Sequence, residues 1–266
     1  MIVFEQKNSY DIDDLIEIVK LLRSEDGCPW DKVQTHKSIR KDFIEETYEA
    51  VEAIDLEDTD LLREELGDVL LQVVFHCQIE REFKHFEFSD ICDELCKKLI
   101  VRHPHVFGDV KADNVEKVLS NWDAIKKDTK HQETYTDTLE SVAKSLPALM
   151  RAQKVGKRAM RAGLDYANLS DTIDALQREL DELKEAVRNG DKDNINEELG
   201  DVLFSATNVA RHADADAEEL LTGSTEKFIR RFSNMEKLIR QDGKDIKDLN
   251  AEELDGYWRK VKENFT

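Results

Sequence analysis

The same seven-residue sequence, Glu-Glu-Leu-Gly-Asp-Val-Leu, occurs twice in this chain, at residues 64–70 and at residues 197–203. Upstream acidic residues keep the same offset of 133 positions, so that Glu46 corresponds to Glu179. Self-similarity at a fixed offset is the sequence signature of duplicated structural units. The chain is therefore predicted to contain two copies of one unit, and any fold for it must accommodate that repeat.

Both copies have the apolar spacing of helices. Within 39–54 and 61–83, and in the matching stretches of the second copy, apolar residues return every three or four positions. Only 10 glycines and 3 prolines are present, which argues against many short strands joined by turns. We predict an all-α chain of two tandem helical bundle units. Apart from the helices around the second heptapeptide, helices are expected over 10–23, 39–54, 61–83, 89–101, 114–127, 140–161, 215–240 and 250–263.

Residues 128–138 contain almost no aliphatic side chains, which is typical of a domain boundary. A chain of 266 residues is long enough for two domains of ordinary size. We therefore expect the first unit to span residues 1–130 and the second to span residues 131–266.

Acidic residues outnumber basic ones, 59 against 39, which gives a net charge of −20. Such a surface repels nucleic-acid phosphates and anionic lipid heads, so direct nucleic-acid or membrane binding is not expected. The sequence shows neither a membrane-spanning apolar run nor a signal peptide pattern. Cys28, Cys77, Cys92 and Cys96 fit no zinc pattern and are expected to be buried or half-buried reduced thiols, which favours a cytoplasmic location.

Two acidic pairs in each copy are spaced to share a helix face. Glu46 and Glu49 are three positions apart, and so are Glu65 and Asp68 on the next predicted helix. If those helices pack antiparallel, four carboxylates converge, and their mutual repulsion requires a cation. All-oxygen ligands favour Mg²⁺ or Mn²⁺. The second copy offers the same set: Glu179, Glu182, Glu198 and Asp201.

An acidic helix face often carries no metal at all, so the position of these pairs matters. Gly67 and Gly200 lie mid-helix beside them, where glycine costs about 1 kcal/mol relative to alanine. A glycine present in both copies beside an acidic pair indicates either a close helix approach or room for a ligand. We therefore favour a metal site over a solvated acidic face.

Several segments, in this order, resemble a known family signature. They are Gly27-Cys-Pro-Trp-Asp31, Gln34-Thr-His36, the acidic segments 45–49 and 64–68, and Arg102-His-Pro-His-Val-Phe107. The chain resembles MazG-type nucleoside triphosphate pyrophosphohydrolases, which belong to the all-α NTP pyrophosphatase superfamily. The resemblance covers essentially the whole chain, both copies included.

The resemblance implies roles for particular residues. It assigns magnesium ligands to the eight carboxylates of the two acidic sets. It assigns substrate contacts to cationic and aromatic side chains, namely Lys227, Arg231 and Trp258 in the second copy and, more loosely, Arg102, Trp122 and Lys126 in the first. The copies differ where Glu45 becomes Arg178, which joins the substrate-binding candidates.

The implied reaction converts a nucleoside triphosphate and water to a nucleoside monophosphate and diphosphate. Glu45 or Glu197 could accept the proton of the attacking water. Lys227 and Arg231 would neutralise charge on the departing diphosphate. Trp258 either stacks on many kinds of base or anchors the terminal helix. The expected role is nucleotide-pool housekeeping or stress control.

Two other functions stay open at this point. One is a narrower substrate within the superfamily, either a pyrimidine deoxynucleotide or a phosphoribosyl nucleotide. The other is a non-catalytic acidic helical module that binds a partner protein. Apolar flanks beside the acidic helices also predict a homodimer, as does the resemblance. Because only the second copy continues into a dense basic helix, we expect it to carry most of the NTP turnover.

Overall fold

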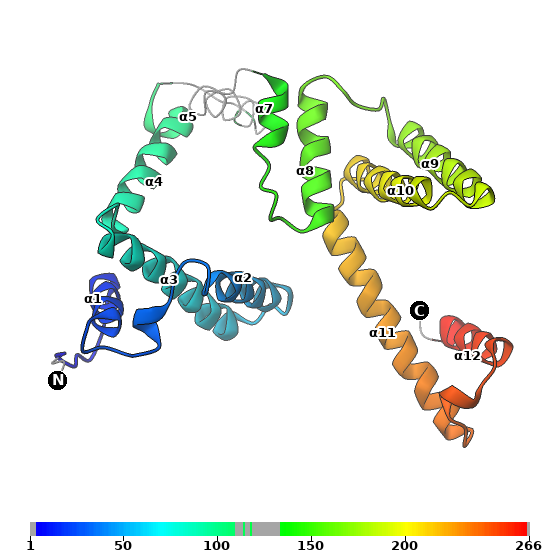
Figure 1. The fold of residues 1–266 in the computed structure, drawn as a ribbon, viewed down its shortest axis with the longest axis horizontal. Helices are drawn as coiled ribbons and strands as arrows, with labels where there is room; N and C mark the ends of the chain where they lie inside the picture. The colour runs from blue at the N-terminus through cyan, green and yellow to red at the C-terminus, as the bar shows by residue number, and fades with distance from the viewer. Residues whose placement is uncertain (1–3, 110–113, 115–117, 119–133, 265–266) are drawn as a thin grey trace. The chain divides into compact units, whose positions relative to one another are not determined.

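The computed structural model describes residues 4–109, 114, 118 and 134–264, and every regular element among them is a helix (Figure 1). The chain divides into two compact units, Met1–Lys126 and Lys127–Thr266. The prediction of an all-α chain with two helical units is confirmed. The boundary predicted after residue 130, and most of the helix predicted over 114–127, lie outside the described residues.

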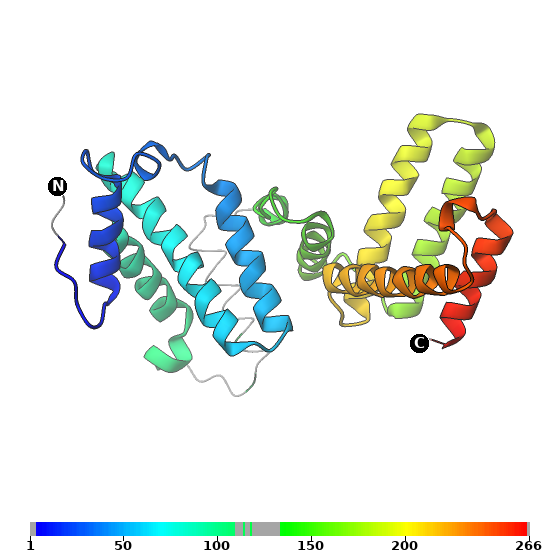
Figure 2. The same ribbon diagram turned by 90° about the horizontal axis from the view of Figure 1, so that it is seen from below.

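In the first unit the two acidic segments lie on neighbouring antiparallel helices, α2 and α3, which are side by side in both views (Figures 1 and 2). Val19 of α1 packs against the C-terminal half of α3, where Val74, Phe75 and Ile79 complete the core. The helical elements are α1 (Ile12–Arg23), η1 (Asp31–Val33), α2 (Arg40–Asp55), α3 (Thr59–Glu82), α4 (Phe88–Arg102) and α5 (Pro104–Phe107).

The second unit repeats this antiparallel pair as α9 and α10 (Figure 2). Helix α8 packs against α10, and α12 packs on the C-terminal half of α11 through Met235, Ile239, Tyr257 and Val261. Its elements are α7 (Tyr135–Glu140), α8 (Ala148–Arg161), α9 (Leu169–Asn189), α10 (Lys192–His212), α11 (Ala217–Gln241), η2 (Ile246–Asp248) and α12 (Ala251–Asn264).

The turns inside the two antiparallel pairs are built alike. Asp58 and Asp191 cap α3 and α10, and each side chain accepts two backbone hydrogen bonds from the first turn of its helix. The residue before each cap has a positive φ, 54° at Glu57 and 68° at Gly190. The same offset therefore relates both the sequences and the backbone conformations of these turns.

The prediction of one continuous helix over 140–161 is wrong. Helix α7 ends at Glu140, and α8 begins only after Pro147. Proline lacks the backbone N–H and its ring clashes with the preceding turn, so a helix cannot run through it undisturbed. Arg158 of α8 reaches back and donates to the Oγ atom of Ser141 at 2.7 Å, which ties the two helices together.

The cysteine prediction is only partly correct. Cys77 is buried and Cys28 is half-buried, whereas Cys92 and Cys96 on α4 are exposed. The reason is that Phe88 at the start of α4 packs against the core, while the side chains beyond the first turn of this helix do not. All four cysteines are free thiols.

Candidate functional site

The acidic residues of the second unit converge between α9 and α10. Glu179 and Glu182 project from α9, and Glu198 projects from α10. Each of these three residues offers a carboxylate oxygen, and the three oxygens all lie within 4.8 Å of one another. Asp201 is close enough that its negative charge adds to theirs.

The first unit contains the matching cluster between α2 and α3. Carboxylate oxygens of Glu46, Glu49 and Glu65 lie within 4.8 Å of one another, and the charge of Asp68 acts on both Glu46 and Glu65. In each unit the helix pairing therefore brings together the two acidic pairs that the spacing singled out.

Burial and repulsion among these carboxylates shift their pKa values upwards. Burial raises the pKa of Glu179, and the charges of Glu182 and Asp201 raise it further. The pKa of Glu198 is raised by the same causes. Glutamates clustered in this way favour a bound cation, and a donor set made only of carboxylate oxygens suits Mg²⁺ or Mn²⁺. Both clusters can thus hold a divalent metal ion.

The two mid-helix glycines do not mediate close helix packing. A Cβ atom built on Gly67 or on Gly200 would meet nothing within 4 Å. The expectation of a close helix approach is therefore wrong. The open space beside each acidic pair agrees with the other reading, which is room for a ligand.

The residues that flank the clusters differ between the units. Burial and neighbouring carboxylates raise the pKa of Glu179, while the positive charge of Arg178 opposes them. In the first unit Glu45 takes the place of Arg178 and is exposed. Glu197, also exposed, precedes Glu198 and adds to the negative charge around it.

Helix α11, which packs against α12, carries the cationic candidates of the second unit (Figure 1). Lys227 and Arg231 lie one turn apart on α11, and the Nε atom of Arg231 is buried without a hydrogen-bond partner. The Trp258 ring packs against Phe228, with ring centroids 5.3 Å apart. Among the described residues, no hydrogen bond or ion pair joins Lys227 or Arg231 to the acidic cluster.

Of the corresponding candidates in the first unit, only Arg102 lies within the described residues. Arg102 is the last residue of α4, and Pro104 begins the short helix α5 that follows it. Trp122 and Lys126 lie outside the described residues.

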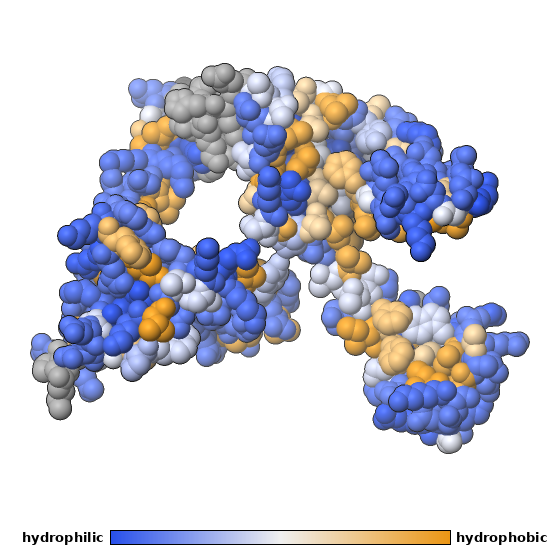
Figure 3. Space-filling view, viewed as in Figure 1, coloured by the Kyte–Doolittle hydropathy of each residue, from blue (hydrophilic) through white to orange (hydrophobic). Residues whose placement is uncertain are grey.

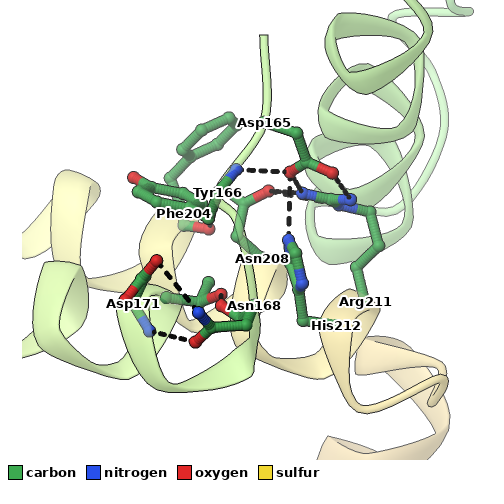
Figure 4. A network of polar contacts seen from close by, with 9 residues as sticks. Asp165, Tyr166, Asn168, Asp171, Phe204, Asn208, Arg211 and His212 are labelled. Carbon is green, nitrogen blue, oxygen red and sulfur yellow. Dashed lines mark hydrogen bonds and ion pairs between the residues drawn. The ribbon is translucent and has the colours of Figure 1, made fainter. Parts of the chain in front are cut away.

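A polar network fixes the loop between α8 and α9 to the end of α10 (Figure 4). Asp165 in that loop accepts hydrogen bonds from the Arg211 guanidinium at 2.5 and 3.1 Å. Its Oδ1 atom also lies 3.0 Å from the Nε2 atom of His212. The hydrogen bond from Arg211 holds the pKa of the Asp165 carboxyl well below its usual value. This network fastens the loop that follows α8 to the C-terminal end of α10.

No role was assigned to the basic helix α8 from the sequence. Its 14 residues include five basic and no acidic side chains, in a chain whose net charge is −20. The Nε atom of Arg151 on this helix is buried and has no hydrogen-bond partner. The run of basic residues can be seen in the sequence. The burial of the Arg151 Nε atom cannot, because it depends on how the helices pack.

Comparison with known proteins adds an independent result. The MazG nucleotide pyrophosphohydrolase domain matches residues 34–107 and 168–236. A nucleoside triphosphate pyrophosphohydrolase of Escherichia coli (strain K12) is 42% identical over 254 residues, covering 94% of this chain and 97% of that protein. The nucleoside triphosphate pyrophosphohydrolase/pyrophosphatase MazG of Thermotoga maritima is 42% identical over 250 residues, covering 94% and 95%. With two tandem copies of the domain, the chain belongs to the MazG family.

Proposed function

We propose that this chain is a magnesium-dependent nucleoside triphosphate pyrophosphohydrolase that converts NTP and water to NMP and diphosphate. The observation that carries the proposal is the convergence of Glu179, Glu182 and Glu198 within 4.8 Å beside open space. Membership of the MazG family and the names of the relatives support the same reaction.

The four carboxylates of the second unit would hold Mg²⁺, with Mn²⁺ as a substitute, and so would their counterparts in the first unit. A metal ion bound there neutralises phosphate charge and lowers the pKa of a bound water. Without the metal ion the carboxylates repel one another, so binding of the ion also stabilises the folded protein.

Side chains around the cluster supply the remaining chemistry. Glu197 is exposed next to a metal ligand and would accept the proton of the attacking water, as would Glu45 in the first unit. Lys227 and Arg231 have no acidic partner among the described residues, so they are available to the departing diphosphate. Trp258 is kept as a candidate contact for the base, although Phe228 covers part of its ring.

The working form in this proposal is a homodimer. Large apolar side chains on the helices that carry the carboxylates are exposed in the single chain, among them Val51 and Leu66 in the first unit and Val187 and Leu203 in the second. A second copy related by two-fold symmetry would cover such faces. Light scattering at micromolar concentration should give twice the mass of the chain, and a monomer mass would contradict this part of the proposal.

The proposed biological setting is control of the nucleotide pool in the cytoplasm, with tolerance of many bases. The free state of all four cysteines supports that compartment. No helix within the described residues is long and apolar enough to cross a membrane.

The deciding experiment measures diphosphate release from each NTP, with Mg²⁺ or with a chelator, and identifies the nucleotide product by chromatography. We expect NMP and diphosphate with Mg²⁺ and neither product with the chelator. If diphosphate is released only from a pyrimidine deoxynucleotide, or only from a phosphoribosyl nucleotide, the enzyme has that narrower substrate and not a broad substrate range. A chain that releases no diphosphate in either condition would be the non-catalytic helical module instead.

A further inference from the structure

Three histidines and a glutamate form a series of short contacts in the first unit. The Nδ1 atoms of His36 and His76 lie 2.6 Å apart. The Nε2 atom of His36 lies 2.6 Å from one carboxylate oxygen of Glu80, and the Nδ1 atom of His85 lies 2.6 Å from the other. We refer to these four residues as the histidine cluster. Glu80 follows Asp68 on α3 by about 18 Å of helix rise, so the histidine cluster is separate from the acidic cluster.

The histidine cluster fastens residues 34–39 to α3. His36 belongs to this segment, whereas His76 and Glu80 belong to α3. The rings of His36 and His76 are stacked, with centroids 4.9 Å apart and an interplanar angle of 10°. Because α2 begins at Arg40, these contacts hold the chain to α3 at the point where it enters the antiparallel helix pair.

An arginine provides a second attachment just before this segment. Arg23 donates to the backbone carbonyl oxygens of Asp31 and Gln34, and it forms two hydrogen bonds of 2.8 Å to Glu82 on α3. A guanidinium group keeps its charge at neutral and mildly acidic pH, so this attachment persists there. Histidine, in contrast, titrates in that range. The two attachments therefore differ in their sensitivity to pH.

The contacts limit how many protons the two stacked rings can hold. An ionised Glu80 carboxylate only accepts, so the Nε2 atom of His36 must donate to it. One proton then fits between the two Nδ1 atoms, because either a neutral His36 accepts from His76 or a protonated His36 donates to it. If both rings were protonated, two N–H groups would face each other across 2.6 Å. The closed arrangement thus admits one added proton and excludes a second.

Few charged groups surround these rings. The hydrogen bond from His85 lowers the pKa of Glu80, and the one from His36 lowers it further, against burial, which raises it. Burial lowers the pKa of His76, and the charge of His36 adds to that effect. Helix α2 contributes the uncharged ring of Phe43, and α1 contributes the arginine already paired on α3. Among the described residues, no charged side chain of η1, α2 or α4 forms a hydrogen bond or ion pair with the cluster.

Protons can reach the histidine cluster from solvent. Hydrophilic side chains cover most of the face of the first unit that is visible in Figure 3. The side chains of His36 and His85 are 41% and 66% exposed, whereas that of Glu80 is 19% exposed. The rings can therefore exchange protons with water while the carboxylate stays largely shielded.

We propose that the histidine cluster is an acid-sensitive clasp, which holds residues 34–39 on α3 near neutral pH and releases them when His36 and His76 are both protonated. The arginine attachment stays in place, so the release is local. The inference does not depend on the reaction that the chain catalyses.

The size of the effect follows from the proton count. The ordinary pKa of histidine is 6.5, and the closed form holds one proton fewer than the released form. Each pH unit below 6.5 therefore favours the released form by about tenfold. The pKa of Glu80 lies below its ordinary value of 4.5, so this carboxylate stays ionised at pH 5. A change between pH 7.5 and pH 5 thus reports on the rings.

The test measures hydrogen exchange of backbone amides in the whole chain at pH 7.5 and pH 5, with each rate divided by the intrinsic rate at that pH. The amides of Ser38 and Ile39 donate to the carbonyl oxygen of Thr35 and report on the clasp. Those of Lys32 and Gln34 report on the arginine attachment. We expect the protection of Ser38 and Ile39 to fall by about tenfold or more at pH 5, and that of the other two to stay unchanged.

Matched variants identify the histidines responsible. His76→Phe keeps a ring against Phe43 but removes its protons, so the protection of Ser38 should no longer depend on pH. His85→Phe makes the same substitution at a histidine that bonds to Glu80 and not to the stacked rings, and it should retain the fall at pH 5. If His76→Phe loses protection throughout the unit, His36→Phe repeats the test at a more exposed position.

Three results would overturn the inference. The first is equal protection of Ser38 and Ile39 at the two pH values in the unmodified chain. The second is a fall in His76→Phe, or in His36→Phe where that variant replaces it, as large as in the unmodified chain. The third is a parallel fall at Lys32 and Gln34, which would mean that the whole unit opens in acid.

Discussion

The Asp165 carboxylate of the second unit is held by the Arg211 guanidinium through two hydrogen bonds, at 2.5 and 3.1 Å. The first unit has an ion pair at the corresponding junction with the charges exchanged. There Arg23, at the end of α1, bonds to Glu82 through two hydrogen bonds of 2.8 Å. An ion pair therefore fastens the end of α1 to the end of α3 in the first unit, and the loop after α8 to the end of α10 in the second, although the residues differ.

We expect Asp165→Asn to destabilise the second unit by about 2 kcal/mol, because Arg211 would lose a charged partner in a largely buried position. The hydrogen bond from Arg211 lowers the pKa of Asp165 below the ordinary value of 3.8. A carboxyl with a lowered pKa stabilises the fold above its unfolded pKa and loses this effect as the pH falls towards its folded pKa. The stability lost in Asp165→Asn should therefore be greatest at neutral pH and should become smaller below about pH 3.8.

Urea unfolding of the second unit at pH 7 and at pH 3 measures this deficit. Asp174→Asn serves as the control, because Asp174 is an exposed acidic residue on α9. The control should change stability little at either pH. An equal deficit of Asp165→Asn at both pH values would contradict the role given to the ionised carboxylate.

Metal-ion binding should stabilise the chain in a way that depends on pH. Burial, together with neighbouring carboxylates, raises the pKa of Glu179 and Glu198 above 4.5. The folded state therefore holds these protons more tightly than the unfolded state, and stability falls as the pH rises from 4.5 through the raised values. At pH 7.5 Mg²⁺ should relieve the repulsion and raise the melting temperature. At pH 4 the shift should be much smaller.

Glu179→Gln offers a sharper version of the same experiment. Without Mg²⁺ at pH 7.5 this variant should melt at a higher temperature than the unmodified chain, since one repelling charge is gone. Its response to Mg²⁺ should be reduced. Glu252→Gln, on the exposed first turn of α12, is the control and should respond to Mg²⁺ normally. A Glu179→Gln chain that melts lower without metal would argue against repulsion in the cluster.

The repeat explains why so much of the fold could be predicted. Two identical heptapeptides at one offset indicated which helices are equivalent, and the acidic spacing indicated which faces meet. Local sequence was sufficient there because α2 pairs with α3, and α9 with α10, across short turns. The break at Pro147 was also readable from the sequence, because a helix cannot run undisturbed through a proline.

The parts that could not be predicted depend on contacts between distant segments. The residues that flank Gly200 in the sequence do not show whether it lies against another helix. In the structure it faces open space. A pocket around Arg151 and Phe204 is formed by α8, the segment before it and α10, which are distant in the sequence. Which side chains are exposed on α4 likewise depends on how little of that helix packs against α3.

Two glycine substitutions should have opposite effects on stability. Gly200→Ala places a methyl group in open space and removes the entropic cost of a helical glycine, so we expect a gain of about 0.5–1 kcal/mol. Gly156→Ala would bring a Cβ atom to 2.7 Å from the Oδ1 atom of Asn208, so we expect a loss of about 1–3 kcal/mol. Thermal unfolding of both variants measures the difference, and a change of the same sign in both would contradict the packing described here.

The activity of the Gly200→Ala variant tests a separate point. If the open space beside Glu198 and Asp201 is room for the substrate, the variant should be more stable and yet release diphosphate more slowly. Gly67→Ala makes the same change beside the acidic cluster of the first unit. A Gly200→Ala chain with unchanged kcat and KM would show that the space is not used.

The last prediction concerns which copy carries the turnover. Both units gather glutamates within 4.8 Å, so both should bind Mg²⁺. The second unit also carries Lys227 and Arg231 on α11, where Trp258 of α12 packs against Phe228, whereas α4 of the first unit ends at Arg102. We therefore expect the second unit to carry most of the diphosphate release. Loss of a carboxylate that holds the metal should slow catalysis by roughly a thousandfold or more.

Glu179→Ala and Glu46→Ala make that comparison, with diphosphate release measured from a mixture of NTPs and folding checked by circular dichroism. Glu179→Ala should remove nearly all activity, and Glu46→Ala should leave most of it. The opposite pattern would assign turnover to the first unit, and equal partial losses would mean two working sites. Because the two glutamates occupy equivalent positions in their clusters, a difference between the variants would come from what surrounds each cluster, above all the cations of α11.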